Sequence, residues 1–287
     1  MATLREIRRR INSVRSTQQI TRAMKMVASA RLRKAQERIL AARPYAYQID
    51  EMIRHLIATI EVPESPLLEE REAQRVLIVA VTADRGLCGA FNSNIIRHVL
   101  EQIDYHRDKE YSLICVGKKG YDFFKRRHYP IEQNYIRFFN ELDYSHARMI
   151  SDYLVGKYER RETDLIEIVY NEFKSAVQQN VIVEKYLPLS VEEFGERKTG
   201  MDYLYEPDKP TLLNSLLPRH LNMQIWRILL ESNAAEQGAR MTAMENATDN
   251  AEELIEHLTL NYNRARQSAI TKEISEIVGG AEALRSA

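Results

Sequence analysis

The feature that most constrains this chain is the long helical pattern at its C-terminal end. No proline follows Pro218, and we expect one helix from about Thr211 to Leu284. Its apolar and small side chains recur at steps of three and four residues, which is the seam spacing of a coiled coil. The predicted seam is Met241, Met244, Ala247, Ala251, Leu254, Leu258, Tyr262, Ala265 and Ala269. The two consecutive steps of four after Leu254 predict a stutter that locally unwinds the supercoil.

Residues 1–60 carry the same spacing. The predicted seam here is Leu4, Ile7, Ile11, Val14, Gln18, Thr21, Lys25, Ala28, Leu32, Ala35 and Ile39, resuming after Pro44 through Ile49, Met52, Ile53, Leu56 and Ile60. A lone helix of this polarity is marginally stable, so most of its stability must come from packing. We therefore expect residues 1–60 and 211–287 to pair as an antiparallel coiled coil.

Between these helices the pattern changes to alternating strands and helices. Residues 76–81 form a continuous apolar run, typical of a strand that is buried on both faces. The elements predicted after it are a helix with an apolar stripe at 95–103, a strand at 111–117, helices at 121–127 and 145–160, and a hairpin of strands at 164–173 and 177–189. This alternation predicts an α/β globular domain of Rossmann-like type over residues 75–190, inserted between the two terminal helices.

The charges are unevenly distributed along the chain. The whole sequence has 41 basic and 41 acidic residues. Residues 1–43, however, hold twelve Lys or Arg against two acids, Glu6 and Glu37, which leaves this basic arm at about +10 and the remainder at about −10. Such asymmetry predicts an acidic partner surface, whether protein, nucleic acid or lipid.

The composition also limits where the chain works. No apolar run approaches the length of a membrane span, and the N-terminus lacks the apolar segment of a signal peptide. Cys88 and Cys115 are too few for a disulfide framework and fit a reducing compartment. We expect a cytosolic protein, or one attached to a cytosolic assembly.

The turn "ADRGLCGAF" (83–91) stands where a nucleotide-binding loop would stand, between a strand and a helix. The dinucleotide fingerprint needs G-x-G-x-x-G, and only Gly86 and Gly89 are present. A tight turn needs glycine for a positive φ with or without a ligand, so we favour a structural role and leave the nucleotide site as the alternative. "GKKG" (117–120) is similar to an RNA-binding clamp but follows a strand instead of joining two helices. Cys88 is interpreted as a packed side chain in preference to a reactive thiol.

The sequence shows no other group of residues that is typical of a catalytic or metal-binding site. The seven histidines show no i, i+4 pairing and no cysteine partners, so no metal site is expected. No nucleophile elbow is present, and no carboxylate pair has a context that favours acid–base work. We therefore expect neither catalytic residues nor a cofactor.

Two apolar surfaces are predicted on otherwise polar helices. Met24 and Met26 cannot both lie on one seam, so one of them faces outward, either incidentally or as part of a sliding contact for which methionine is well suited. The last turns carry an apolar side formed by Ile270, Ile274, Ile277 and Val278. An exposed patch of this kind needs a pocket, and we favour burial in a partner over self-association.

Five segments together resemble one family. "REIRRRINSVRSTQQITRAMKMVASARLRKAQ", "TADRGLCGAFN", "DYLYEPD", "ARMTAMENATDNA" and "YNRARQSAITKEISEIVGGAEAL" are similar, in this order, to the gamma subunit of F-type ATP synthases. The resemblance implies a non-catalytic central-stalk rotor. Its coiled coil would stand inside a hexamer of three alpha and three beta subunits, and its globular end would contact the epsilon subunit and the membrane c-ring. Ion-driven rotation of the ring would then change the conformations of the beta subunits for ATP synthesis.

The resemblance also assigns roles to individual residues. It implies that Met24 and Lys25 contact beta, and that Arg240, Gln267 and Thr271 form a polar catch for a beta loop. It implies that the apolar tip held in the alpha/beta sleeve is Ile274, Ile277 and Val278. The residues implied to face the c-ring and epsilon are Tyr203, Tyr205 and Glu206.

The sequence has neither the inserted cysteine pair of the chloroplast type nor a transit peptide. We therefore expect a bacterial subunit, peripheral on the cytoplasmic face of the cell membrane, that touches the membrane only through the c-ring and binds no nucleic acid. Two rival hypotheses remain, a nucleic-acid-binding coiled coil that uses the basic arm and an α/β enzyme with helical arms.

Overall fold

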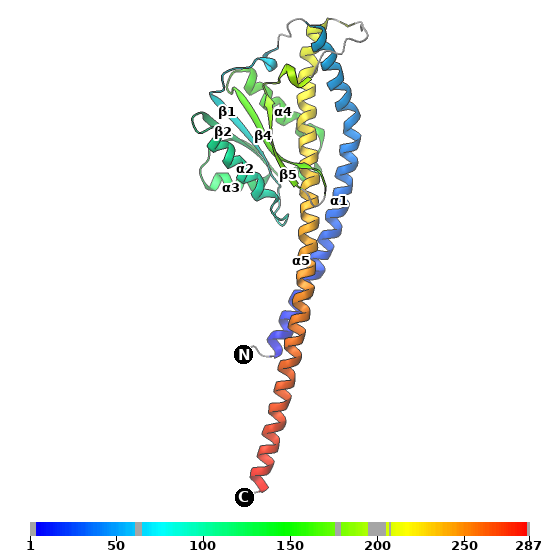
Figure 1. Cartoon of the computed structure of the whole chain (residues 1–287), viewed down its shortest axis with the longest axis vertical. Coiled ribbons are helices and arrows are strands. Elements are labelled where there is room, and N and C mark those ends of the chain that lie inside the picture. The colour runs from blue at the N-terminus through cyan, green and yellow to red at the C-terminus, as the bar shows by residue number, and fades with distance from the viewer. Residues whose placement is uncertain (1–3, 61–64, 176–178, 195–204, 207, 286–287) are drawn as a thin grey trace. The chain divides into compact units, whose positions relative to one another are not determined.

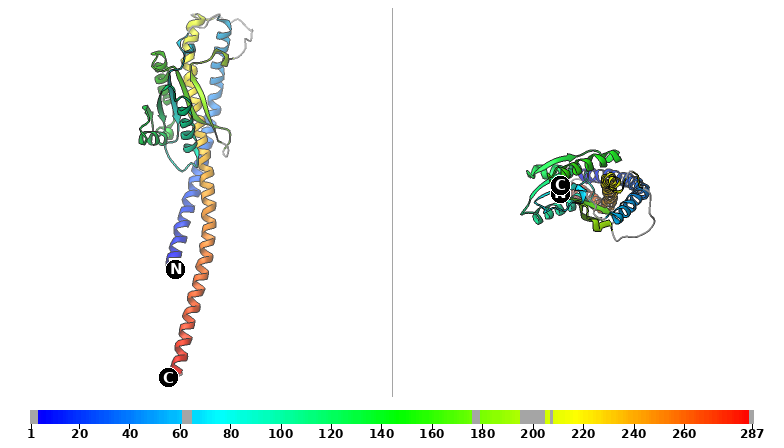
Figure 2. Two further views of the ribbon diagram at one scale, coloured as in Figure 1. Left: turned by 60° about the vertical axis from the view of Figure 1, so that its left-hand side comes forward. Right: turned by 90° about the horizontal axis from the view of Figure 1, so that it is seen from above.

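A computed structural model describes residues 4–60, 65–175, 179–194, 205–206 and 208–285 (Figures 1 and 2). The chain divides into two compact units. One is Ala28–Arg240, and the other combines Met1–Val27 with Met241–Ala287. Two long helices contribute to both units: α1 spans Leu4–Thr59, continuing through Pro44, and α5 spans Lys209–Arg285. The long terminal helices expected from the sequence are therefore present, whereas the three domain boundaries drawn from the sequence stay predictions.

The unit Ala28–Arg240 is built on a five-stranded sheet. Its strands are β1 (Arg75–Val81), β2 (Glu110–Val116), β3 (Ile131–Tyr135), β4 (Leu165–Phe173) and β5 (Gln179–Leu187). They lie in the order β3-β2-β1-β4-β5; the first four are parallel, and β5 runs antiparallel to β4. This is the strand order of a doubly wound sheet, extended by a hairpin at one edge. The mixed α/β domain and the hairpin predicted from the sequence are confirmed.

Helices cover both faces of this sheet (Figures 1 and 2). α2 (Phe91–Tyr105) and α3 (Lys118–Arg126) pack on one face, and α4 (Tyr144–Glu159) packs on the other together with α1 and α5. Because side chains alternate along a strand, Val76 and Ile78 of β1 enter the first core, and Leu77 and Val79 enter the second. Three short 3-10 turns complete the unit: η1 (Pro66–Leu68), η2 (Phe139–Glu141) and η3 (Val191–Phe194).

Strand β3 is the element that the sequence did not reveal. Its sequence, IEQNY, is mostly polar, and it forms one edge of the sheet by pairing with β2. An edge strand receives ladder hydrogen bonds from one side only and keeps much of its surface in water, so it needs no continuous apolar run. The apolar pattern that marks β1 is therefore absent here.

The predicted seam of α5 is wrong at Leu254. That side chain is 39% exposed, whereas its neighbour Ile255 is partly buried. The side chains that are buried or partly buried along one stripe are Met244, Thr248, Ala251, Ile255, Leu258, Tyr262 and Ala265. Their steps alternate regularly between four and three, so the stutter expected from the sequence does not occur.

Two polar contacts join α1 and α5 within the smaller unit. The hydroxyl oxygens of Thr21 and Thr248 lie 2.8 Å apart, and the Lys25 ammonium donates to a Glu245 carboxylate oxygen at 2.6 Å. From the first contact to the second, the sequence position increases along α1 and decreases along α5, so the two helices run antiparallel here. None of the described helices has the length and apolarity that a membrane span requires.

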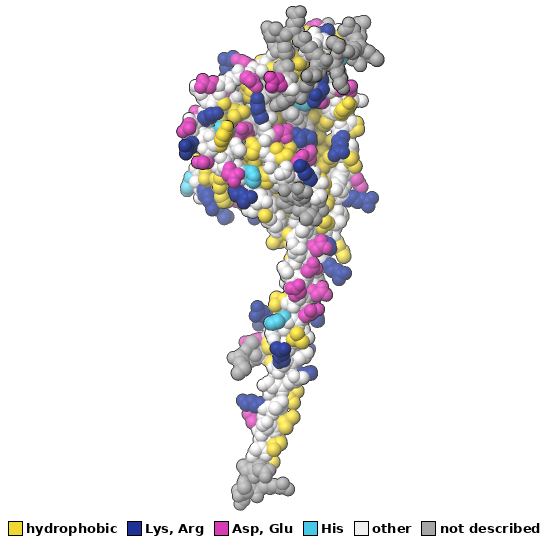
Figure 3. Space-filling view, in the orientation of Figure 1, with side chains coloured by type: hydrophobic (Ala, Val, Ile, Leu, Met, Phe, Trp, Pro, Cys, Tyr) yellow, Lys and Arg dark blue, Asp and Glu magenta, His cyan; other side chains and the backbone are white. Residues whose placement is uncertain are grey.

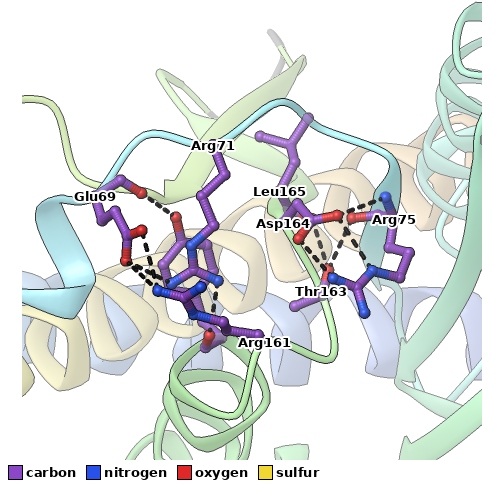
Figure 4. A network of polar contacts seen from close by, with 8 residues as sticks. Glu69, Arg71, Arg75, Arg161, Thr163, Asp164 and Leu165 are labelled. Atoms are coloured by element: carbon purple, nitrogen blue, oxygen red, sulfur yellow. Dashed lines mark hydrogen bonds and ion pairs between the residues drawn. The ribbon is translucent and has the colours of Figure 1, made fainter.

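A polar network fixes the segment that leads from η1 into β1 (Figure 4). The Tyr158 hydroxyl of α4 donates to the Glu69 carbonyl oxygen at 2.6 Å, and the Arg71 guanidinium lies over the Tyr158 ring at 4.4 Å. The Arg161 guanidinium reaches the Glu69 carboxylate at 3.3 Å. The start of β1 is thus held to the end of α4.

The buried anchor beside this network is Asp164, whose side chain is 7% exposed. Its carboxylate accepts the backbone N–H of Arg75 at 2.9 Å, and it also accepts the guanidinium of the same residue at 2.9 and 3.2 Å (Figure 4). Burial raises the pKa of Asp164, but these hydrogen bonds and the charge of Arg75 lower it more, so the pKa lies below its ordinary value. The ionised carboxylate therefore joins the first residues of β1 and β4.

We predict that Asp164→Asn lowers the free energy of unfolding by about 1–3 kcal/mol at pH 7, because the amide loses a charge-assisted pair. A lowered folded-state pKa gives stability that is present above the unfolded value of about 3.9 and is lost as the pH falls through the folded value. The difference between wild type and variant should therefore shrink below pH 4. Urea denaturation followed by fluorescence of Trp226, the single tryptophan, which packs against the core, measures it. A gap that is constant from pH 7 to pH 3 would contradict the role of the ionised carboxylate.

Candidate functional site

The glycine corner lies at the carboxyl end of β1, where doubly wound sheets bind their ligands. In this chain the place between β1 and β4 is covered by α5. Ala235 and Ala239 of α5 pack in the same core as Cys88 and Phe91 of the corner, and all four are almost fully buried. The corner is thus packed against α5 of the same chain.

The polar groups of the corner are also engaged internally. The Asp84 carboxylate accepts three backbone N–H groups, from Lys118 at 3.0 Å, Arg137 at 2.8 Å and Phe139 at 3.4 Å. Asp84 therefore ties the loop after β1 to the loops after β2 and β3. The Asn92 side chain accepts the Ala83 N–H at 2.9 Å, which fixes the start of α2.

The glycines have structural reasons to be glycine. Gly117 has a φ of 94°, and a Cβ there would lie 2.0 Å from the Thr82 carbonyl oxygen. A Cβ on Gly120 would lie 2.8 Å from the Thr82 hydroxyl, which accepts the Gly120 N–H. "GKKG" is thus a close approach between two strand ends, and the positive φ of Gly89, 56°, serves a tight turn. These observations favour the structural interpretation of both motifs.

The remaining chemical candidates are weak. Cys88 is 1% exposed, and burial raises the pKa of its thiol despite the nearby Arg240 cation; burial also raises the pKa of Cys115 to about 12. Thiols with raised pKa values are poor nucleophiles at neutral pH. Among the described residues, no three His, Cys, Asp or Glu side chains lie together in a way that would hold a metal ion.

The residues that the resemblance implies for beta contact fall into different environments. Met24 is partly buried and Met26 is 63% exposed, while the Lys25 side chain is 39% exposed and paired with Glu245. Gln267 and Thr271 are both exposed on α5. Met24 and Lys25 thus lie on α1, whereas Gln267 and Thr271 lie on α5.

Arg240 differs from the others because it is only 8% exposed. Its guanidinium donates to the carbonyl oxygen of Gly86 and to the carboxylate of Glu236, which is itself 5% exposed. Burial raises the pKa of Glu236, against the opposing effect of the Arg240 charge. The polar groups of Arg240 are thus used within the unit Ala28–Arg240.

The last described turns of α5 are exposed on every side, from residue 266 to residue 281. The apolar side expected there is present, with Ile274, Ile277 and Val278 exposed by 56%, 67% and 59%, and Ile270 by 47%. Figure 3 shows these apolar side chains in a line along the end of the helix.

The residues implied to face the c-ring and epsilon are only partly visible. Tyr203 lies outside the described residues. Tyr205 is partly buried, with its ring centroid 6.4 Å from that of His55 and 5.2 Å from the Lys209 ammonium, and Glu206 is exposed.

Sequence reasoning did not predict the partners of Thr21, Lys25 and Arg240. Thr248 and Glu245, which contact α1, lie within the segment "ARMTAMENATDNA" but were given no role, and Glu236, which pairs with Arg240 on α5, was not singled out. The i, i+4 spacing of Glu236 and Arg240 is the one signal that could have suggested their pairing.

Comparison with known proteins supports one family. A family model described as ATP synthase matches residues 3–284. The chain is 51% identical to the ATP synthase gamma chain of Prosthecochloris aestuarii, over 99% of both chains. It is 50% identical to that of Chlorobium phaeobacteroides, over 99% of this chain and all of the relative, and 49% identical to that of Chlorobium limicola over the full length of both.

Solved structures agree with this assignment. A chain of the Tetrahymena thermophila mitochondrial ATP synthase central stalk and c-ring is 26% identical, with a TM-score of 0.62 over 79% of this chain and 99% of that one. A chain of the Euglena gracilis mitochondrial ATP synthase, 21% identical, shares the fold with a TM-score of 0.72 over 99% of this chain and 95% of that one. With a family model that spans the chain and relatives near half identity over its whole length, this protein belongs to the gamma subunits of F-type ATP synthases.

Proposed function

We propose that this chain is the rotor of the central stalk, which couples ion-driven rotation of a membrane c-ring to ATP synthesis at the beta subunits and has no catalytic site of its own. The observation that carries the proposal is the fully exposed helix of residues 266–281. A helix without a packed side is marginal in water, and its apolar stripe at Ile274 and Ile277 requires a surrounding wall. In a gamma subunit, that wall is a sleeve of alternating alpha and beta subunits, three of each.

The terminal helices form the shaft of this rotor as an antiparallel coiled coil. Support comes from the antiparallel contacts of Thr21 with Thr248 and of Lys25 with Glu245. The regular buried stripe of α5 from Met244 to Ala265 also has the seam spacing of a two-stranded coil.

The basic arm attracts the acidic lobes of beta without interlocking with them. We assign Met24 and the exposed part of Lys25 to this contact, although the Lys25 ammonium also pairs with Glu245 of α5. Gln267 and Thr271 are exposed and free to engage a beta loop as a polar catch, whereas the burial of Arg240 removes it from direct reach. Ile274, Ile277 and Val278 are the tip in the sleeve.

The opposite end of the chain contacts the c-ring and the epsilon subunit through the segment of Tyr203, Tyr205 and Glu206. The subunit is then peripheral on the cytoplasmic face of a bacterial membrane and touches that membrane only through the ring. Because the rod is not symmetric, each of its orientations makes different contacts with the three beta subunits. These differences shift each subunit in turn among its conformations, which is the work required for ATP synthesis.

The enzyme hypothesis is disfavoured because α5 and Asp84 occupy the corner that a nucleotide would need. Binding of nucleic acid by the basic arm is the remaining rival. It predicts micromolar or tighter affinity for duplex or RNA, falling steeply with salt.

We predict that co-expression with alpha and beta subunits yields a stable complex that holds one copy of this chain and hydrolyses ATP. The purified chain alone should release no nucleotide on denaturation, as measured by ultraviolet absorbance. Stoichiometric nucleotide in the isolated chain, or failure of the three subunits to assemble, would count against the rotor.

We further predict that Met24→Lys impairs coupling more than folding. The added cation would pair with acidic side chains of beta. If this pair stabilises one rotational position of the rotor by about 1.4 kcal/mol, rotation away from that position slows about tenfold. The measurement is ion pumping per ATP hydrolysed by the complete enzyme in vesicles. Met149→Lys, the same change at a methionine of α4 that is 55% exposed, is the matched control. Equal coupling in both variants would remove Met24 from the beta contact.

A further inference from the structure

Two loops at the carboxyl edge of the sheet are hydrogen-bonded to both α1 and α5. These contacts lie near Ala28 on α1 and at Arg240 on α5, which are the bounds of the larger unit. One loop is residues 84–90, after β1, and the other is residues 137–142, after β3. We refer to these loops, with the side chains that hold them to the helices, as the collar.

The α5 side of the collar is Arg240. Its guanidinium spans from the Glu236 carboxylate on its own helix to the Gly86 carbonyl oxygen in the first loop. The Arg240 and Glu236 side chains are only 10% and 7% exposed. Removing one partner of such a pair leaves an uncompensated buried charge, so this contact resists release.

Asp84 joins the two loops to each other. Its carboxylate accepts the N–H groups of Arg137 and Phe139 in the second loop and that of Lys118 at the start of α3. Three backbone donors on one ionised side chain hold the loops in a single arrangement.

The α1 side is formed by two arginines one heptad apart. Arg38 donates to the Leu142 carbonyl oxygen at 3.1 Å, and Arg31 donates to the Asn140 side chain at 3.4 Å. A continuous set of hydrogen bonds therefore runs from α5 through both loops to α1.

A second anchor holds α5 further along its length. Arg227 contacts Glu184 of β5 at 2.5 Å and the Tyr170 hydroxyl of β4 at 3.0 Å. Arg227 and Arg240 are separated by thirteen residues, or about 20 Å of helix. Both anchors add oriented polar contacts to the apolar packing of α5, and two at this separation resist twisting of the helix against the sheet better than one.

We propose that Arg240 is a positioning residue that transmits torque between α5 and the α/β unit through the collar. This inference rests on the rotor function proposed above and assigns Arg240 to the inside of the rotor. In this role the guanidinium contacts no beta loop. It keeps the helix in rotational register with the sheet while the shaft is under load.

The test is the torsional stiffness of the rotor in the assembled complex of this chain with alpha and beta. The alpha–beta hexamer is fixed to a surface, and a bead is attached to the α/β unit through Tyr105→Cys, at an α2 side chain that is 76% exposed. The angular variance of the bead during nucleotide-free dwells is inversely related to stiffness. Because apolar packing also holds α5 to the sheet, losing one of two polar anchors should raise the variance of Arg240→Gln above that of wild type by up to about twofold.

Three further variants separate this role from others. Arg240→Lys keeps the charge beside Glu236 but loses the planar fork, and it should restore part of the stiffness. Arg85→Gln removes an exposed arginine from the same loop and should leave the variance unchanged. Arg38→Gln acts on the α1 side of the collar and should also raise the variance, so it carries the test if Arg240→Gln does not assemble.

The possible outcomes are distinct. If both Arg240→Gln and Arg38→Gln have the wild-type variance, the inference is overturned. If their melting temperature nevertheless falls, the collar serves folding stability alone. Unchanged variance with a longer dwell places Arg240 on beta and also overturns it. A wild-type complex that does not rotate would instead contradict the proposed function.

Discussion

Coverage of the apolar side of α5 is the constraint on which the rest of the structure depends. A helix of 77 residues is stable only where packing supports it, and the packing of α5 changes along its length. From Leu221 to Arg240 most side chains are buried against the sheet and α1. From Met244 to Ala265 a single stripe is covered, and from residue 266 to 281 nothing within the described chain covers it. The uncovered part is where a partner must supply the missing packing.

The fold was predictable where the local pattern of apolar residues determines the secondary structure. β1 is apolar from Val76 to Val81, and the terminal helices keep their spacing over many turns, so both were visible in the sequence. The choice between Leu254 and Ile255 was not, because both are apolar and adjacent. It depends on the register against α1, and polar contacts such as Thr21 with Thr248 mark that register. Strand β3 was missed for a related reason, since pairing with β2 places it there without any apolar pattern.

The candidate site was less predictable than the fold. The missing third glycine weakened the nucleotide hypothesis, but the sequence could not reveal the packing of the corner, which comes from contacts distant in sequence, between Gly117 and Thr82 and between α5 and the corner. Arg240 shows the limit most clearly. A resemblance can suggest a partner for an arginine, but its 8% exposure and its hydrogen bonds to Gly86 and Glu236 are visible only in the structure.

The two ways in which this chain uses arginine suit two mechanical tasks. In the collar, the buried guanidinium of Arg240 and the more exposed ones of Arg31 and Arg38 donate to oriented acceptors. Such hydrogen bonds weaken steeply with misalignment, so they resist rotation of the groups that they join. Of the twelve cations in the basic arm, Lys25 and Arg33 form ion pairs among the described residues, and Arg31 and Arg38 belong to the collar. The other eight are exposed, so most of the charge of the arm faces outward. Charge attraction through water acts over about 8 Å at physiological salt and varies little with small changes of angle. An arm of this kind can be held close to an acidic wall and still turn, while the collar carries the torque.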